Sequence, residues 1–142
     1  MYFYNQIALK DSFETRLYLM FMHLSIILII FKNKRINFPQ ESYDGLFYCI
    51  ENDLRELGFG DINVNKKMKN FNKIFYDILL KINKVEKKFI INKKLVCKYF
   101  SELDKTNNTK YAYFDRYFTK FYHFCFGLPP KTMIKDAIKF KV

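Results

Sequence analysis

The first strong pattern in the chain is a segment that is apolar on every side. From Leu17 to Phe31 only His23 and Ser25 interrupt the run, and Asp11 followed three residues later by Glu14 resembles a capping box. A helix without a polar face is surrounded by other elements. As a helix the run would reach about 22 Å, short of the roughly 30 Å core of a bilayer. We therefore predict a buried central helix over residues 12–34 rather than a membrane span.

Two amphipathic segments follow, and glycine separates them. Pro39 suits a helix start, and Gly58 provides a residue that can end the helix in the left-handed conformation. Asn63 is the expected N-cap of the next helix. The apolar stripe of the first helix is Tyr43, Leu46, Phe47, Ile50, Leu54 and Leu57. That of the second is Val64, Met68, Phe71, Phe75, Ile78, Leu79 and Ile82.

The rest of the chain also predicts helices, over 92–103, 110–126 and 132–140, with a polar loop at 104–109. The segment from Tyr111 to Phe126 contains nine aromatic residues, more than one helical face can bury. Phe114, Phe118 and Phe121 are expected to face inward, and the surplus predicts an exposed apolar patch. The fold class is all-α, a single domain over 1–142 with about six helices.

Charge is the main compositional signal. The chain carries a net charge of +11, with 21 lysines but only four arginines. Eleven lysines lie between residues 66 and 98, which favours a positive surface for ribosomal or membrane phosphate, although AT-rich codon usage would enrich lysine too. Specific base recognition would use arginine, so specific DNA recognition is not expected. The candidate basic ridge is Lys66, Lys67, Lys69, Lys73, Lys81 and Lys84. Of these, Lys66, Lys73, Lys81 and Lys84 are expected on the face of the second amphipathic helix that lies opposite its apolar stripe.

Candidate catalytic chemistry is sparse. The two histidines have no ordered set of partners, and phosphate-binding, dinucleotide and zinc motifs are missing from the sequence. Cys49, Cys97 and Cys125 are odd in number and far apart, which predicts three small buried hydrophobic residues in a reducing compartment. We expect no enzyme activity, cofactor or metal site.

One ordered series of motifs is more specific. It comprises Leu54 to Asp61, the lysine-rich Val64 to Lys69 and the pair Phe75-Tyr76, preceded upstream by Asp11 to Arg16. Over roughly residues 11–80 this series resembles the ubiquinol–cytochrome c chaperones, which help to assemble respiratory complex III. The chain departs from that family at Asp77-Ile78, where relatives usually have Gly-Arg.

The resemblance implies a non-enzymatic chaperone that binds newly made cytochrome b and acts with a small partner protein near the ribosome. It implies a location at the inner membrane, on the cytoplasmic side in a bacterium or the matrix side in a mitochondrion. The alternatives are a basic module that binds nucleic acid or ribosomes and a peripheral membrane protein. The candidate client-binding or partner-binding residues are Arg16, His23, Asp53, Arg55, Gly58, Gly60, Asp61, Phe75 and Tyr76.

Arg16 and His23 lie seven residues apart and so share one face of the first long helix. Two interpretations stay open for them. They form a buried polar pair that Asp53 or Asp61 satisfies, or they contact a client within a groove.

Overall fold

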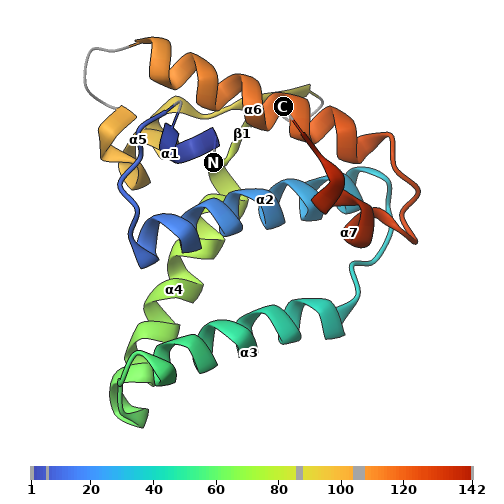
Figure 1. The fold of residues 1–142 in the computed structure, drawn as a ribbon. Helices are drawn as coiled ribbons and strands as arrows, with labels where there is room; N and C mark the ends of the chain where they lie inside the picture. The colour runs from blue at the N-terminus through green and yellow to red at the C-terminus, as the bar shows by residue number, and fades with distance from the viewer. Residues whose placement is uncertain (1, 6, 86–87, 104–107, 142) are drawn as a thin grey trace.

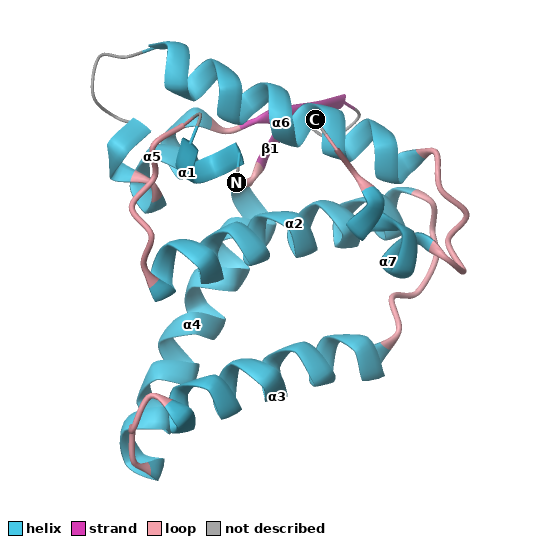
Figure 2. Ribbon diagram, in the orientation of Figure 1, coloured by secondary structure: helices cyan, strands magenta, loops and turns pink. Residues whose placement is uncertain are grey.

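The computed structural model describes residues 2–5, 7–85, 88–103 and 108–141 (Figure 1). The predicted all-α class is confirmed, since helices dominate the fold and the sheet has two short strands (Figure 2). The helices are α1 (Tyr2–Asn5), α2 (Phe13–Asn33), α3 (Gln40–Glu56), α4 (Asp61–Lys81), α5 (Lys93–Tyr99), α6 (Asn108–Phe126) and α7 (Met133–Asp136). The strands are β1 (Asn83–Val85) and β2 (Lys88–Ile91), and 3₁₀ turns cover Ser101–Leu103 and Ala137–Lys139.

Helix α2 lies at the centre, as predicted, and packs against α4 and α6 (Figure 1). Its N-cap is Ser12, whose hydroxyl accepts a hydrogen bond from the Thr15 amide, so the prediction that Asp11 opens the helix was wrong by one residue. Within the described residues α2 alone is long and apolar enough to cross a membrane, and 56% of its most hydrophobic window is buried in the fold. The helix therefore packs as the core element.

An aromatic cluster holds α3 and α4 onto α2. The Phe21 ring of α2 lies 6.0 Å from that of Phe47 on α3 and 5.2 Å from that of Phe75 on α4. Phe47 and Phe75 also contact each other, with ring centroids 5.5 Å apart. Offset and edge contacts of this kind add stabilisation beyond the burial of apolar area. The cluster is therefore the point where the three long helices meet.

Gly58 makes the corner between α3 and α4, as predicted. Its φ is +95°, and its amide donates to the Arg55 carbonyl at 3.0 Å while the Phe59 amide donates to the Leu54 carbonyl at 3.3 Å. The next helix begins at Asp61 with Gly60 as N-cap, so Asn63 is already inside it and the predicted cap was wrong. The corner is short enough for α4 to start three residues after Gly58.

The hairpin of β1 and β2 was not predicted. The two strands pair in antiparallel fashion, and the Asn83 side chain accepts a hydrogen bond from the Ile90 amide at 2.9 Å. Phe89 and Ile91 are buried and alternate with exposed residues, a period-two signal too short to stand out among the helical patterns. Lys84 consequently lies on β1, so its predicted place on a helical lysine face was wrong.

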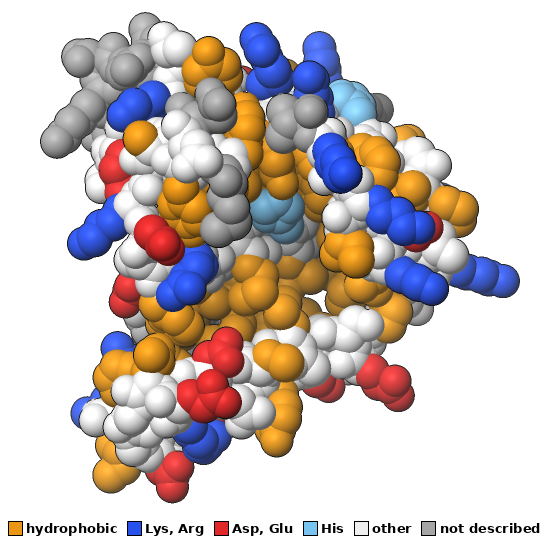
Figure 3. All heavy atoms as spheres, viewed as in Figure 1, with side chains coloured by type: hydrophobic (Ala, Val, Ile, Leu, Met, Phe, Trp, Pro, Cys, Tyr) orange, Lys and Arg blue, Asp and Glu red, His pale blue; other side chains and the backbone are white. Residues whose placement is uncertain are grey.

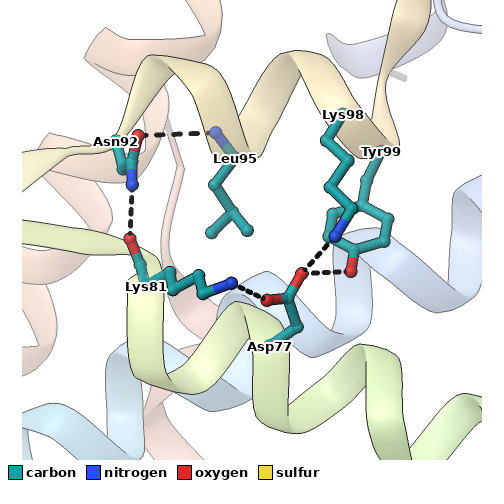
Figure 4. Close-up of polar contacts among 6 residues, drawn as sticks. All are labelled: Asp77, Lys81, Asn92, Leu95, Lys98 and Tyr99. Atoms are coloured by element: carbon teal, nitrogen blue, oxygen red, sulfur yellow. Dashed lines mark hydrogen bonds and ion pairs between the residues drawn. The ribbon is translucent and has the colours of Figure 1, made fainter.

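A polar cluster around Asp77 joins α4 to α5 (Figure 4). The Asp77 carboxylate pairs with Lys81 at 2.8 Å and with Lys98 at 2.9 Å, and the Tyr99 hydroxyl donates to it. These bonds, from Lys81 first and then Tyr99, hold the pKa of Asp77 well below its usual range. The residue that departs from the usual family pattern thus has a structural role.

Helix α5 ends at Tyr99, earlier than predicted, and α6 starts at Asn108, where a loop was predicted. The remainder of that loop, 104–107, lies outside the described residues. Similarly, the predicted last helix is divided into α7 and the 3₁₀ turn Ala137–Lys139. The predicted helices are therefore present, but their first and last residues differ from the predicted ones.

The aromatic surplus of α6 is covered rather than exposed. Phe114, Phe118 and Phe121 are buried as predicted. Tyr122 stacks on Phe89 of the hairpin with ring centroids 4.6 Å apart. Segments from both ends of the chain cover Tyr117, whose ring lies 4.5 Å from Phe3 and 5.2 Å from Phe140. The predicted exposed patch is therefore reduced to Phe126 at the helix end.

The cysteines were predicted to be buried, and this is correct for Cys125 alone. Cys97 is half-buried, and Cys49 is exposed on the outer face of α3. Cys49 is exposed because α3 buries one side only, at Phe47, Ile50 and Leu54.

Replacement of Gly58 by alanine should lower the melting temperature by roughly 3–8 °C, because a side chain at positive φ costs about 1–2 kcal/mol. No atom lies within 4 Å of the added Cβ, so the cost is conformational. Gly45→Ala is the matched control, since this exposed glycine lies within α3 and alanine there should raise the melting temperature. Thermal denaturation followed by circular dichroism measures both. Equal shifts in the two variants would contradict the assignment of the corner.

Candidate functional site: an apolar groove beside the central helix

A groove of about 500 Å³ lies between α2 and α3. Its walls are apolar, and its rim carries one cation, Arg16, and two carboxylates, Asp53 and Glu56. The apolar lining residues are Phe13, Leu17, Met20, Ile50 and Leu57. Figure 3 shows this face hollowed above α3, with hydrophobic side chains across the hollow and acidic side chains on its α3 side.

A second cavity of about 410 Å³ extends the groove along α2, and Met20 lines both parts. The start of α3, helix α6 and the C-terminal segment enclose this end, which is more apolar. The lining includes Leu24, Ile27, Phe38, Leu46, Phe121, Ile134, Ile138 and Phe140. Ile138, in the C-terminal 3₁₀ turn, is 85% exposed at this end of the groove.

His23 lies at the wall of the second cavity in a fixed protonation state. Its Nδ1 lies 2.6 Å from the Leu19 carbonyl, which only accepts, so Nδ1 carries the proton. Nε2 is then free to accept from the Tyr117 hydroxyl at 2.9 Å. Burial lowers the pKa of His23 to about 4, although the bond to Leu19 acts in the opposite direction. The ring is thus neutral at pH 7 and links α2 to α6.

The predicted polar pair of Arg16 and His23 is not formed. Arg16 is exposed in the first turn of α2 and lies 3.9 Å from Asp11, while His23 turns to Tyr117. Asp61 pairs with Arg55 at 3.4 Å and so is not the partner of Arg16 or His23. The reason is that His23 finds both hydrogen-bonding partners on its own helix and on α6.

The structure distributes the other candidates over different surroundings. Asp53 lines the groove, and Gly58, Gly60 and Asp61 form the corner beside it. Phe75 is completely buried in the core. Arg55 bonds Glu51 at 3.1 Å, and Tyr76 is half-exposed and 3.5 Å from the Tyr43 hydroxyl.

The lysines of the basic ridge lie on two elements, α4 and β1. Lys66, Lys69 and Lys73 are exposed on α4. Lys67 lies over the Phe59 ring at 4.6 Å, and Lys81 pairs with Asp77. Lys81 and, on β1, Lys84 are exposed as well, so the exposed lysines extend along α4 and into the hairpin.

Sequence reasoning did not identify the groove itself. Leu17, Met20 and Ile50 fitted the core pattern, and Leu57 completed the α3 stripe. Leu57 is nevertheless 60% exposed, because it follows the last residue of α3 and lines the open groove. A periodic apolar pattern does not show whether another helix packs against each residue of the stripe.

The model of the ubiquinol-cytochrome C chaperone family matches residues 5–88, which contain α2, α3, α4 and β1. The chain therefore belongs to this family, and membership implies a chaperone role with a client protein. Comparisons with curated proteins and with solved structures gave no match. Within the described ranges, no group of three or more His, Cys, Asp or Glu side chains could hold a metal ion.

Because the pKa of His23 is lowered, the folded protein should begin to lose stability at a higher pH than the one at which carboxylates are protonated. The His23 side chain binds a proton near pH 6.5 in the unfolded chain but only near pH 4 in the folded protein. The free energy of unfolding is therefore highest above pH 6.5 and falls as the pH is lowered towards 4. Between pH 7 and pH 5 the loss should be about 2 kcal/mol. Urea denaturation at the two pH values measures this. The loss should disappear in His23→Gln and persist in His123→Gln, and a loss unchanged in His23→Gln would refute the assignment.

Proposed function

We propose that this protein is a non-enzymatic assembly chaperone for respiratory complex III that holds a newly made hydrophobic helix of cytochrome b in the groove between α2 and α3. The observation that carries the proposal is the pair of apolar cavities that adjoin at Met20 along α2. The first cavity lies wholly within the segment that the family model matches, and α6 contributes to the second. The C-terminal segment, outside that match, encloses one end of the groove. A small partner protein that stabilises the complex with the client is part of the proposal.

The energetics of such a groove suit temporary binding. Burial of three or four leucine-sized client side chains would contribute about 5–10 kcal/mol. The loss of translational and rotational freedom costs a similar amount. Net binding would then be weak enough for release to the assembling complex, while the client helix stays protected from aggregation.

The groove makes a direct prediction about client capture. Leu57→Ser combined with Ile138→Ser should reduce the recovery of cytochrome b by about tenfold, because both exposed apolar side chains line the groove. The measurement is a pull-down with tagged protein from detergent-solubilised membranes at high salt, quantified by mass spectrometry.

A matched control is available on α4. Leu80 and Ile62 are 78% and 74% exposed and do not line the groove, so Leu80→Ser with Ile62→Ser should leave capture unchanged. Equal losses in the two double variants would refute the groove as the client site. Recovery of ribosomal proteins alone would refute cytochrome b as the client.

We also propose that the exposed lysines of α4 hold the protein at a phosphate surface of the ribosome or the membrane. The density of lysine between residues 66 and 98 favours this. The location would then be peripheral to the inner membrane, on its cytoplasmic side in a bacterium or its matrix side in a mitochondrion.

Charge reversal tests the α4 surface. Lys66→Glu with Lys73→Glu should abolish sedimentation with ribosomes or flotation with anionic liposomes while the melting temperature stays within about 2 °C, because both side chains are exposed. Lys131→Glu with Lys135→Glu changes the net charge equally at exposed positions near α7 and should leave association in place. Normal association of the α4 variant would exclude this surface from the mechanism.

A further inference from the structure

The groove carries a local charge opposite to that of the whole protein. Asp53 and Glu56 are exposed carboxylates on its α3 rim, in a chain with a net charge of +11. Among the described residues no cation forms an ion pair with either. The nearest cation in sequence, Arg55, is engaged with Glu51 at 3.1 Å and Asp61 at 3.4 Å. Two carboxylates are thus available at the edge of an apolar site.

The cation on the opposite wall offsets only part of this charge, since one arginine faces two carboxylates. Arg16 lines the same part of the groove, and it also lies 3.9 Å from Asp11, which is outside the groove lining. At the other end the lining is apolar apart from His23, Ser42 and Tyr117, and His23 is neutral at pH 7. The groove therefore has one acidic end and one uncharged end.

The length of the groove limits what it can hold. Its lining on α2 runs from Phe13 to Ile27, which corresponds to about 21 Å, or a helix of about 14 residues. A membrane-spanning helix has about 20 apolar residues and is flanked by lysine and arginine on its cytoplasmic side. Such a helix would fill the groove and extend beyond at least one end.

We infer that the groove selects an apolar helix with lysine or arginine at one end and orients it with this basic end against Asp53 and Glu56. This inference rests on the proposed function and adds the chemical class and direction of the client segment. The apolar part of the helix would then lie along Met20 towards Ile134 and Ile138. The long-range field of a protein with net charge +11 favours the opposite choice, an acidic client, so the two effects can be separated.

Three synthetic peptides test the selection. They share one apolar helical core of about 14 residues and differ at one end, which carries two lysines, two glutamates or two serines. Their affinities for the full-length protein are measured by fluorescence anisotropy in a mild non-ionic detergent. The lysine peptide should bind about fivefold more tightly than the glutamate peptide.

Neutral variants of the two rim carboxylates test whether these residues cause the preference for lysine. Asp53→Asn with Glu56→Gln should remove the preference for lysine at an unchanged fold, as the melting temperature reports. Glu41→Gln with Asp44→Asn changes the charge of α3 equally outside the groove lining and should keep the preference.

The outcomes separate the two proposals. Equal or tighter binding of the glutamate peptide, or a lysine preference that survives in Asp53→Asn with Glu56→Gln, overturns the inference while the groove remains the client site. Binding that is absent for all three peptides, or that is insensitive to Leu57→Ser with Ile138→Ser, overturns the groove function and the inference together.

Discussion

The need to bury α2 governs how the other helices of this protein are arranged. This helix has apolar residues on all sides, so every exposed face would cost about 25 cal/mol for each Å² left in water. Helices α4 and α6 cover two of its sides, and the aromatic contacts of Phe21 attach α3 as well. The terminal segments then cover α6 in turn.

The groove exists because this coverage is incomplete on one side. Helix α3 is held at Phe47 and by the Gly58 corner, and the space along α2 on this side remains open at both cavities. The same apolar surface that stabilises the fold elsewhere is therefore available to a client here. In this protein the core and the candidate binding site are two parts of one hydrophobic surface.

The prediction of candidate residues succeeded where a local rule governs them and failed where distant partners do. Gly58 was identified because only a left-handed residue ends α3 at that point. Arg16 and His23 were paired wrongly because their shared helical face says nothing about Tyr117, 94 residues from His23 in the chain. The Asp77 cluster was missed for the same reason, since two of its partners, Lys98 and Tyr99, lie on α5.

The all-α class, the central helix, the glycine corner and the inward residues of α6 could be predicted from the sequence, since each depends on periodicity or on the conformation of one residue. Packing between distant segments instead places Lys84 on a strand, covers Tyr117 and Tyr122 of α6 and leaves Leu57 exposed in a groove. The physical reason is that an apolar side chain has the same pattern in the sequence whether its partner is present or absent. Whether that side chain is buried in the core or left exposed for a client depends on where the next helix lies.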